Sequence, residues 1–183
     1  EKCDVSIEYL STDIAKLKLK KDSYWVFLDS ISMTLDSMYI DSVLYYGMYP
    51  FNASCPTRTY EGYAFSLKSS LDTSKLDVYR LKAGSFDRNP ASLLDANGSI
   101  YVDYGFGALA QGSNNTLLKK DSVFVYDQYY KNVVIVTRPN DNTEAKKTIY
   151  YINSEYGFLK KEIYSSTNAL LSKKVLKSKN VIR

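Results

Sequence analysis

Short runs of β-branched and aromatic residues recur along the chain, and polar turn residues separate them. The first run, Tyr24–Leu28, ends at the turn pair Asp29-Ser30, and a second run follows at Met38–Tyr46. The two runs predict an antiparallel pair of strands around a loop at 30–36. Further strands are predicted at Tyr60–Leu67, Leu76–Lys82, Ser99–Tyr104, Val123–Tyr126, Asn132–Thr137, Thr148–Ile152 and Phe158–Tyr164.

The spacing of apolar residues inside these runs indicates how each strand is buried. Asp77–Lys82 alternates between polar and apolar residues, which predicts a strand with one solvent-exposed face and one buried face. Val133–Val136 does not alternate and predicts a strand buried on both faces. Residues 168–176 fit both a helical turn and a broken strand, so the pattern alone leaves that segment open.

Turn and cap signals divide the chain between the strands. Asn97-Gly98 predicts a hairpin turn, and Glu155-Tyr156-Gly157 places a glycine that tolerates positive φ between two strands. Asn89–Leu94 has the form of a short helix, with Asn89 as its N-cap and Pro90 at its first position.

Many short strands and little helix predict an all-β fold, an antiparallel β-sandwich or open barrel with at most one or two short helices. The 183 residues, of which 45% are hydrophobic, suffice for one core. We therefore expect a single β-rich domain over 1–183, with residues 1–10 as a loosely attached N-terminal arm.

The chain has 18 tyrosines and no histidine, and the missing histidine restricts the chemistry. Ser-His-Asp and Cys-His mechanisms and histidine zinc sites are excluded. A hydrolase with paired carboxylates remains open because 20 acidic residues are present, although no spacing marks a pair. Gly105–Ala110 matches a dinucleotide-binding fingerprint, but no βαβ unit surrounds it, so we expect no cofactor. Asp95–Ser99 lacks the spacing of a calcium loop, and we expect no metal.

Two groups of tyrosines next to turns are the candidate ligand-binding residues. Exposed rings on a β surface can stack on sugar rings or fill a protein interface, and the competing interpretation is that they cap the core with hydroxyls in water. The candidates are Tyr45, Tyr46, Tyr49, Tyr126, Tyr129 and Tyr130.

The C-terminal third of the chain is rich in lysine, and the formal net charge is +4. Such a surface can face a nucleic acid, an anionic glycan or lipid headgroups. We expect a solvated face and no nucleic-acid partner, because arginine is scarce and no RNA-binding aromatic platform is recognisable. The basic residues are Lys160, Lys161, Lys173, Lys174, Lys177, Lys179 and Arg183.

The two cysteines, Cys3 and Cys55, could form one disulfide or remain separate thiols. A bond would close a loop of about 52 residues and stabilise the fold by roughly 4 kcal/mol in the chain-entropy model. Lys2 breaks the rule for a lipidated cysteine at Cys3, so a lipid anchor would lie upstream. No apolar run is long enough to span a bilayer, and the opening Glu1–Asp4 is that expected of a trimmed product.

Two parts of the chain form recognisable motifs, namely Tyr24–Ser30 followed by Asp36–Ile40, and Thr148–Ile152 followed by Tyr156–Lys161. The first resembles the "YWVY-x-DS … DS-x-YV" opening, and the second the "TYYxxxxYGLVK" hairpin, of uncharacterised secreted proteins and lipoproteins of Bacteroidetes. The motifs cover about a fifth of the chain. The resemblance implies a β-rich fold, a strand at 174–181, export, and residence in the periplasm or at the outer-membrane surface. It carries no activity and no catalytic residues.

We therefore expect an exported cell-envelope β domain with a non-catalytic binding or structural role. The alternatives are a carbohydrate-binding module that uses surface tyrosines and, less favoured, a carboxylate-dependent hydrolase. The expected partner is a glycan or another envelope protein, and contact with a membrane is expected only through a lipid anchor upstream of this chain.

Overall fold

Antiparallel strands form almost all of the described chain, which confirms the all-β class. The computed structural model describes residues 6–10, 12–50, 58–74, 76–83, 92–95, 98–102, 116–139 and 145–182. The elements are β1 (Ser6–Glu8), α1 (Thr12–Ala15), β2 (Tyr24–Asp29), β3 (Thr34–Pro50), β4 (Arg58–Ser69), β5 (Leu76–Lys82), β6 (Ser92–Asp95), β7 (Gly98–Val102), β8 (Thr116–Val125), β9 (Gln128–Pro139), β10 (Ala145–Asn153), β11 (Gly157–Ser165) and β12 (Leu170–Asn180).

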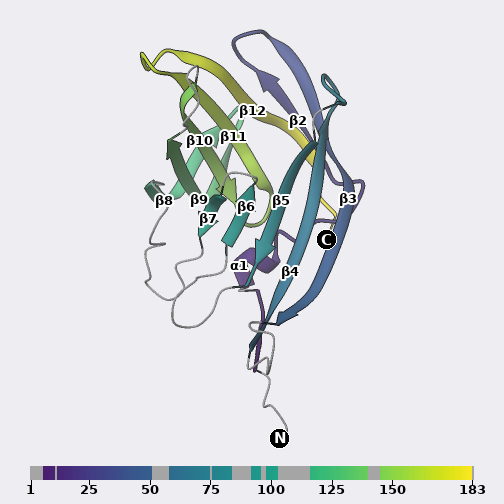
Figure 1. Ribbon diagram of the computed structural model, residues 1–183. Helices are drawn as coiled ribbons and strands as arrows, with labels where there is room; N and C mark the ends of the chain where they lie inside the picture. Colours follow the sequence, from purple (N-terminus) through teal and green to yellow (C-terminus); the bar gives the residue numbers. More distant parts are fainter. Residues whose placement is uncertain are drawn as a thin grey trace, which may run out of the picture.

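Two antiparallel meanders make up the sheet. The strand order is β7-β6-β5-β4-β3-β2-β12-β11-β10-β9-β8, so nearly every strand pairs with its neighbour in sequence, and β12 joins the two halves by pairing with β2. Figure 1 shows the sheet strongly curved, with β3, β4 and β5 on one side and β8 to β12 on the other. Over the residues that the structure describes, the outermost strands of this order, β7 and β8, are not paired with each other, so the sheet is not closed. The architecture is thus the open form of the predicted all-β fold.

The core is centred on Trp25, which is fully buried. Along β2 the side chains of Trp25 and Phe27 are buried and that of Tyr24 is exposed, as the two-residue period of a strand requires. Aromatic rings extend this core across the sheet, because Tyr79 packs 4.9 Å from Phe158 and 5.6 Å from Phe65, centroid to centroid. Much of the tyrosine and phenylalanine content is therefore explained by sheet packing.

Most of the predicted strands are present with longer ends. β2 and β3 form the predicted antiparallel pair, but the turn is shorter than expected and β3 begins at Thr34. Residues 133–136 are buried or half-buried throughout, which confirms the interpretation of that non-alternating run. Gly98 pairs with Asp95, so a hairpin lies where Asn97-Gly98 predicted one. β12 confirms the strand expected at 174–181 over 174–180.

The predicted helix at 89–94 is wrong for its second half. Ser92–Asp95 forms β6, and Leu93 pairs with Leu81 of β5. Two leucines beside an existing strand gain ladder hydrogen bonds there, and this tertiary pairing overrides a local cap signal. Residues 89–91 lie outside the described part of the chain. The short helix α1 was not predicted.

Part of the expected N-terminal arm pairs with the sheet. Ser6–Glu8 runs parallel to β4, in register with residues 58–60. Beyond it, the buried carboxylate of Glu61 accepts a hydrogen bond from the Leu10 amide (2.9 Å) and pairs with the ammonium of Lys18. These contacts hold the segment that carries α1 against the sheet.

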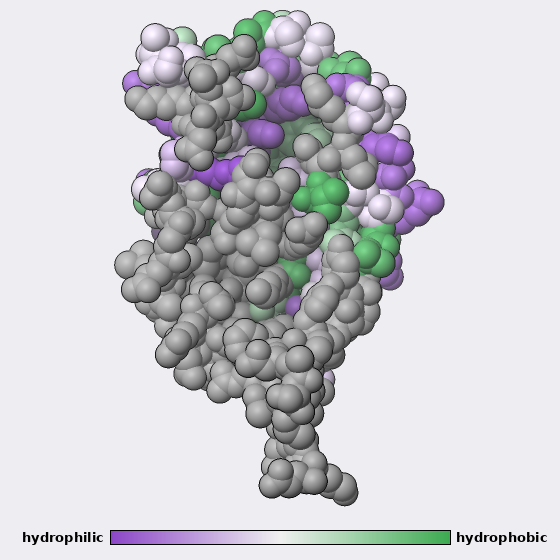
Figure 2. Space-filling view, in the orientation of Figure 1, coloured by the Kyte–Doolittle hydropathy of each residue, from purple (hydrophilic) through white to green (hydrophobic). Residues whose placement is uncertain are grey.

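Several apolar side chains at the tips of the hairpins are exposed. In Figure 2 hydrophobic groups lie beside hydrophilic ones at the upper end of the molecule, where the β2–β3 and β11–β12 hairpins lie in Figure 1. The exposed residues in these hairpins include Ile31, Met33, Leu35, Leu170 and Leu171. No helix among the described residues is long and apolar enough to cross a bilayer.

Candidate functional site

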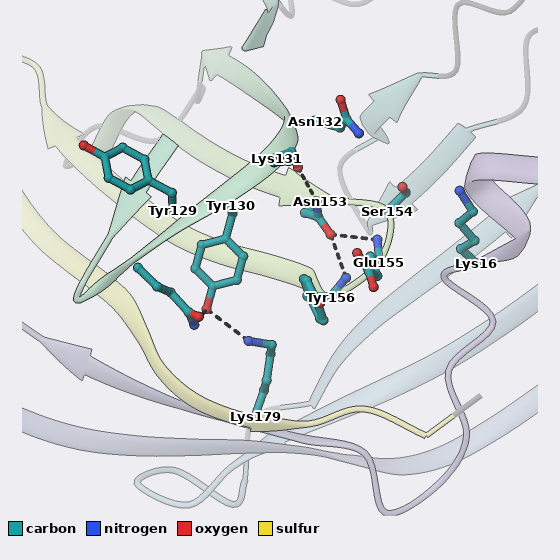
Figure 3. Close-up of a pocket in the computed structure, with 11 residues that line it drawn as sticks. Lys16, Tyr129, Tyr130, Lys131, Asn132, Asn153, Ser154, Glu155, Tyr156 and Lys179 are labelled. Carbon is teal, nitrogen blue, oxygen red and sulfur yellow. Dashed lines mark hydrogen bonds between the residues drawn. The ribbon is translucent and has the colours of Figure 1, made fainter. Parts of the chain in front are cut away.

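A pocket of about 650 Å³ opens beside the β10–β11 turn and is the candidate functional site. The start of β9, the β10–β11 turn, β12 and the residue after α1 contribute its walls, so segments far apart in sequence meet there (Figure 3). The lining residues are Lys16, Gln128, Tyr129, Tyr130, Lys131, Asn132, Asn153, Ser154, Glu155, Tyr156 and Lys179.

The side chain of Asn153 shapes the β10–β11 turn by forming hydrogen bonds with backbone groups of the turn and of β9. Its side-chain oxygen accepts hydrogen bonds from the amides of Glu155 (2.8 Å) and Tyr156 (2.9 Å), an Asx-turn arrangement. Its side-chain nitrogen donates to the carbonyl of Lys131 on β9 (2.6 Å). Gly157 then adopts φ 77°, a left-handed conformation that favours glycine, and a Cβ at this position would be in ordinary contact with the Trp25 ring at 3.4 Å.

Replacing Asn153 by alanine is expected to loosen the pocket and lower the free energy of unfolding by about 1–3 kcal/mol, because three partly buried backbone groups lose their partner. Urea denaturation followed by circular dichroism would measure the loss. Asn180→Ala is the control, since Asn180 is exposed at the end of β12. Equal stability of both variants would contradict the role given to Asn153.

Lys179 connects β12 to both aromatic walls of the pocket. Its ammonium lies 4.8 Å from the ring centroid of Tyr130 and 4.4 Å from that of Tyr156, and donates to the Tyr130 hydroxyl (3.0 Å). The two rings meet edge to face at 5.8 Å. Figure 3 shows Tyr130 and Lys179 pointing toward each other, while Lys16 and Glu155 lie on another side of the pocket.

Tyr129 presents the most exposed tyrosine ring of the described pocket lining, with 72% of its surface accessible. The ring packs against Phe124 on the neighbouring strand β8, 5.0 Å between centroids. Phe124 is itself 55% exposed, so the pair forms an exposed aromatic surface on the face of β8 and β9 opposite to Tyr130. A flat, rigid and exposed ring of this kind can stack on the apolar face of a ligand.

The structure separates the candidate tyrosines. Tyr129 and Tyr130 both line the pocket, but as consecutive residues of β9 they place their side chains on opposite faces of the strand, so Tyr129 is 72% exposed and Tyr130 only 4%. Tyr126 is 43% exposed in the β8–β9 turn and is not among the pocket residues. Tyr45, Tyr46 and Tyr49 lie on β3, and their side chains are outside the described set, as are Cys3 and Cys55.

Sequence reasoning missed the residues that complete the pocket. The sequence predicts a solvated basic face for Lys179 and a turn for Tyr156, and it does not single out Asn153. Only the Asn153-x-x-Tyr156-Gly157 spacing, which suits an Asx turn with a glycine, gave a local signal. The lysine belongs to the site because β12, paired with β11 and β2 in the sheet, brings it beside Tyr130 and Tyr156.

Other charged groups in the sheet have structural partners. The Glu162 carboxylate pairs with Lys160 (2.7 Å) and lies 3.3 Å from the hydroxyl of Tyr151. Burial, and then the negative charge and hydrogen bond of Glu162, raise the pKa of Tyr151 to about 12. In the described part of the chain, no three potential metal ligands (His, Cys, Asp or Glu) gather at one place.

Comparisons with protein-family models, curated proteins and solved structures find no match to this chain.

Proposed function

We propose that this chain is an exported, non-catalytic binding domain of the cell envelope whose pocket binds a saccharide. The observation that carries the proposal is the combination of a pocket of about 650 Å³ with the exposed ring of Tyr129 in its lining. Ligand pockets combine a shaped cavity with a few placed polar groups. Here the aromatic ring would stack on a sugar, while the amide and hydroxyl groups of Gln128, Asn132 and Ser154 would bind its hydroxyls.

The charges of the pocket favour binding over hydrolysis. Among the described lining residues, Glu155 is the single carboxylate, whereas glycoside hydrolysis requires two facing carboxyl groups. Export to the envelope is supported by the resemblance of the Tyr24–Ser30 and Tyr156–Lys161 motifs to secreted Bacteroidetes proteins. The charges of the pocket lining and the expected export together favour a glycan at the cell surface or in the periplasm as the ligand.

Replacing Tyr129 by alanine is expected to weaken binding of a saccharide by roughly 5- to 30-fold, because loss of one stacking ring costs about 1–2 kcal/mol. The wild-type chain would first be screened on an array of bacterial and plant glycans. The tightest glycan would then be titrated calorimetrically into wild type and Tyr129→Ala.

Tyr126→Gly is the matched control, because it removes a neighbouring exposed tyrosine that does not line the pocket. Glycine also suits the φ of 58° at that position. Equal losses in the two variants, or an array on which the wild-type chain binds no glycan, would contradict the proposal.

A further inference from the structure

Lys179 differs from three partly buried lysines of the sheet that pair with carboxylates. Lys160 lies 2.7 Å from the carboxylate of Glu162, Lys174 lies 2.6 Å from that of Asp36, and Lys18 pairs with Glu61. Lys179 instead contacts two aromatic faces and one hydroxyl. Within the described part of the chain, none of the ion pairs and no further contact supplies it with a carboxylate.

The aromatic contacts position this ammonium but leave its charge uncompensated. A ring quadrupole attracts a cation without neutralising it. Lys179 is half-buried at the pocket wall, where the reduced dielectric strengthens its attraction for an anion. A ligand oxyanion would therefore supply what carboxylates supply to Lys160 and Lys174.

The Tyr130 hydroxyl provides a second donor at the same place. Its oxygen accepts hydrogen bonds from Lys179 (3.0 Å) and from the side chain of Gln128. Among the described residues, its own hydrogen has no acceptor, although the side chain is 4% exposed. Buried hydroxyl donors are normally satisfied, so this one favours an acceptor atom of a bound ligand.

The formal charge of the described pocket lining agrees with this assignment. Lys16, Lys131 and Lys179 contribute three positive charges, and Glu155 contributes one negative charge. A positive pocket concentrates anionic ligands.

We propose that the saccharide bound in this pocket carries a carboxylate or sulfate group, and that Lys179 and the Tyr130 hydroxyl hold that group. The inference rests on the proposed function and specifies the class of saccharide. Lys179 acts as the anion anchor, while the Tyr129 ring, on the opposite face of β9, stacks on a sugar ring beyond the anionic group.

The test uses matched pairs of glycans that differ only in charge. Suitable pairs are oligogalacturonates and their methyl esters, glucuronoxylan and its carboxyl-reduced form, and sulfated and desulfated chondroitin, all presented at neutral pH on one array. The preferred pair is then titrated by calorimetry into wild type, Lys179→Met, Lys179→Arg and Lys177→Met. Lys177 is the control because it is exposed on the same strand and does not line the pocket.

We expect wild type to bind the acidic member at least about tenfold more tightly than the neutral one, the gain of a charge-assisted hydrogen bond. Lys179→Met should reduce this ratio to about one, whereas Lys179→Arg and Lys177→Met should retain most of the ratio. Thermal unfolding of each variant separates binding from stability.

If Lys179→Met is less stable but keeps the ratio of affinities for the acidic and the neutral glycan, Lys179 has only a structural role and the inference is overturned. Equal binding of both members by wild type, with binding still sensitive to Tyr129→Ala, would overturn the inference and leave the proposed function standing. Binding to neither member of any pair would overturn both.

Discussion

Replacing Trp25 by alanine is expected to lower the free energy of unfolding by about 3–5 kcal/mol, the usual cost of removing a large buried aromatic side chain. Trp25 is fully buried at the centre of the core. Its ring fills the space directly beside Gly157, 3.4 Å from the position a Cβ would occupy there, so the loss leaves a cavity under the β10–β11 turn.

The same substitution is expected to disturb the pocket. The indole N–H of Trp25 donates to the carbonyl of Tyr156 (2.8 Å), and Tyr156 is one of the two aromatic walls around Lys179. Trp25→Phe keeps most of the buried volume but leaves that carbonyl without its donor. We therefore expect Trp25→Phe to lose about 1–3 kcal/mol, less than alanine.

Urea denaturation followed by far-UV circular dichroism would measure both losses, since Trp25 is the only tryptophan and its fluorescence disappears with it. Tyr24→Ala is the matched control on the same strand, because its side chain is 41% exposed on the opposite face. A Trp25→Ala variant as stable as Tyr24→Ala would contradict the assignment of Trp25 to the centre of the core.

Replacing Lys174 by methionine is expected to cost about 3–5 kcal/mol, because it leaves a buried carboxylate without its cation. The Asp36 side chain is 1% exposed, and its two oxygens accept from Lys174 (2.6 Å) and from the Ser69 hydroxyl (2.6 Å). This arrangement ties β3 to β12 and β4 across the join between the two meanders. The stability is lost because the desolvated carboxylate of Asp36 is left without a cation. This cost is larger than the net attraction between Lys174 and Asp36.

The pair Lys68–Asp41, in which neither group is buried, gives a control for this prediction. Its ammonium and carboxylate are 2.9 Å apart, but the side chains are 32% and 35% exposed. Lys68→Met should therefore cost much less than Lys174→Met in the same urea experiment. The double variant Asp36→Leu/Lys174→Met should recover much of the loss, since no unpaired charge then remains buried. Equal costs for Lys68→Met and Lys174→Met would contradict this account.

The same carboxylate predicts how stability depends on pH. Burial raises the pKa of Asp36, but the hydrogen bonds from Lys174 and Ser69 and the charge of Lys174 outweigh burial and place its pKa below the ordinary value. The pKa of Asp29 is lowered in the same way, where hydrogen bonds from Ile31, Ser32 and Ser172 outweigh its burial.

A carboxyl group whose pKa is lower in the folded protein than in the unfolded chain stabilises the fold at pH values above the unfolded pKa of about 3.9. This contribution is lost as the pH falls through the pKa of the folded state. We expect the free energy of unfolding of wild type to decline below about pH 4, and the decline to be shallower in Asp36→Asn. Urea denaturation at several pH values would measure both slopes. Parallel slopes would show that Asp36 has the same pKa in both states.

The sequence determined the class of fold and much of the strand layout. Val133–Val136 and Leu76–Lys82 are predicted as strands because the burial of a strand determines where its apolar residues occur. A strand buried on both faces has a continuous apolar run, and a strand with one buried face has apolar residues at alternate positions. The β10–β11 turn was located by Gly157, since local backbone geometry depends on local residues. β6 was missed because its pairing with β5 depends on a neighbour about a dozen residues away, and not on its own cap signal.

The sequence also brought Tyr129 and Tyr130 forward by their place beside a turn, but it could not separate their roles. Whether a tyrosine is exposed or buried depends on the segments that pack against its side chain. Tyr130 is covered by β12 and by the β10–β11 turn, which approach β9. Lys179 belongs to the pocket for the same reason. Charge and aromatic character are properties of single residues and can be read along the chain, whereas the environment of a lysine is decided by which strands the sheet places beside it.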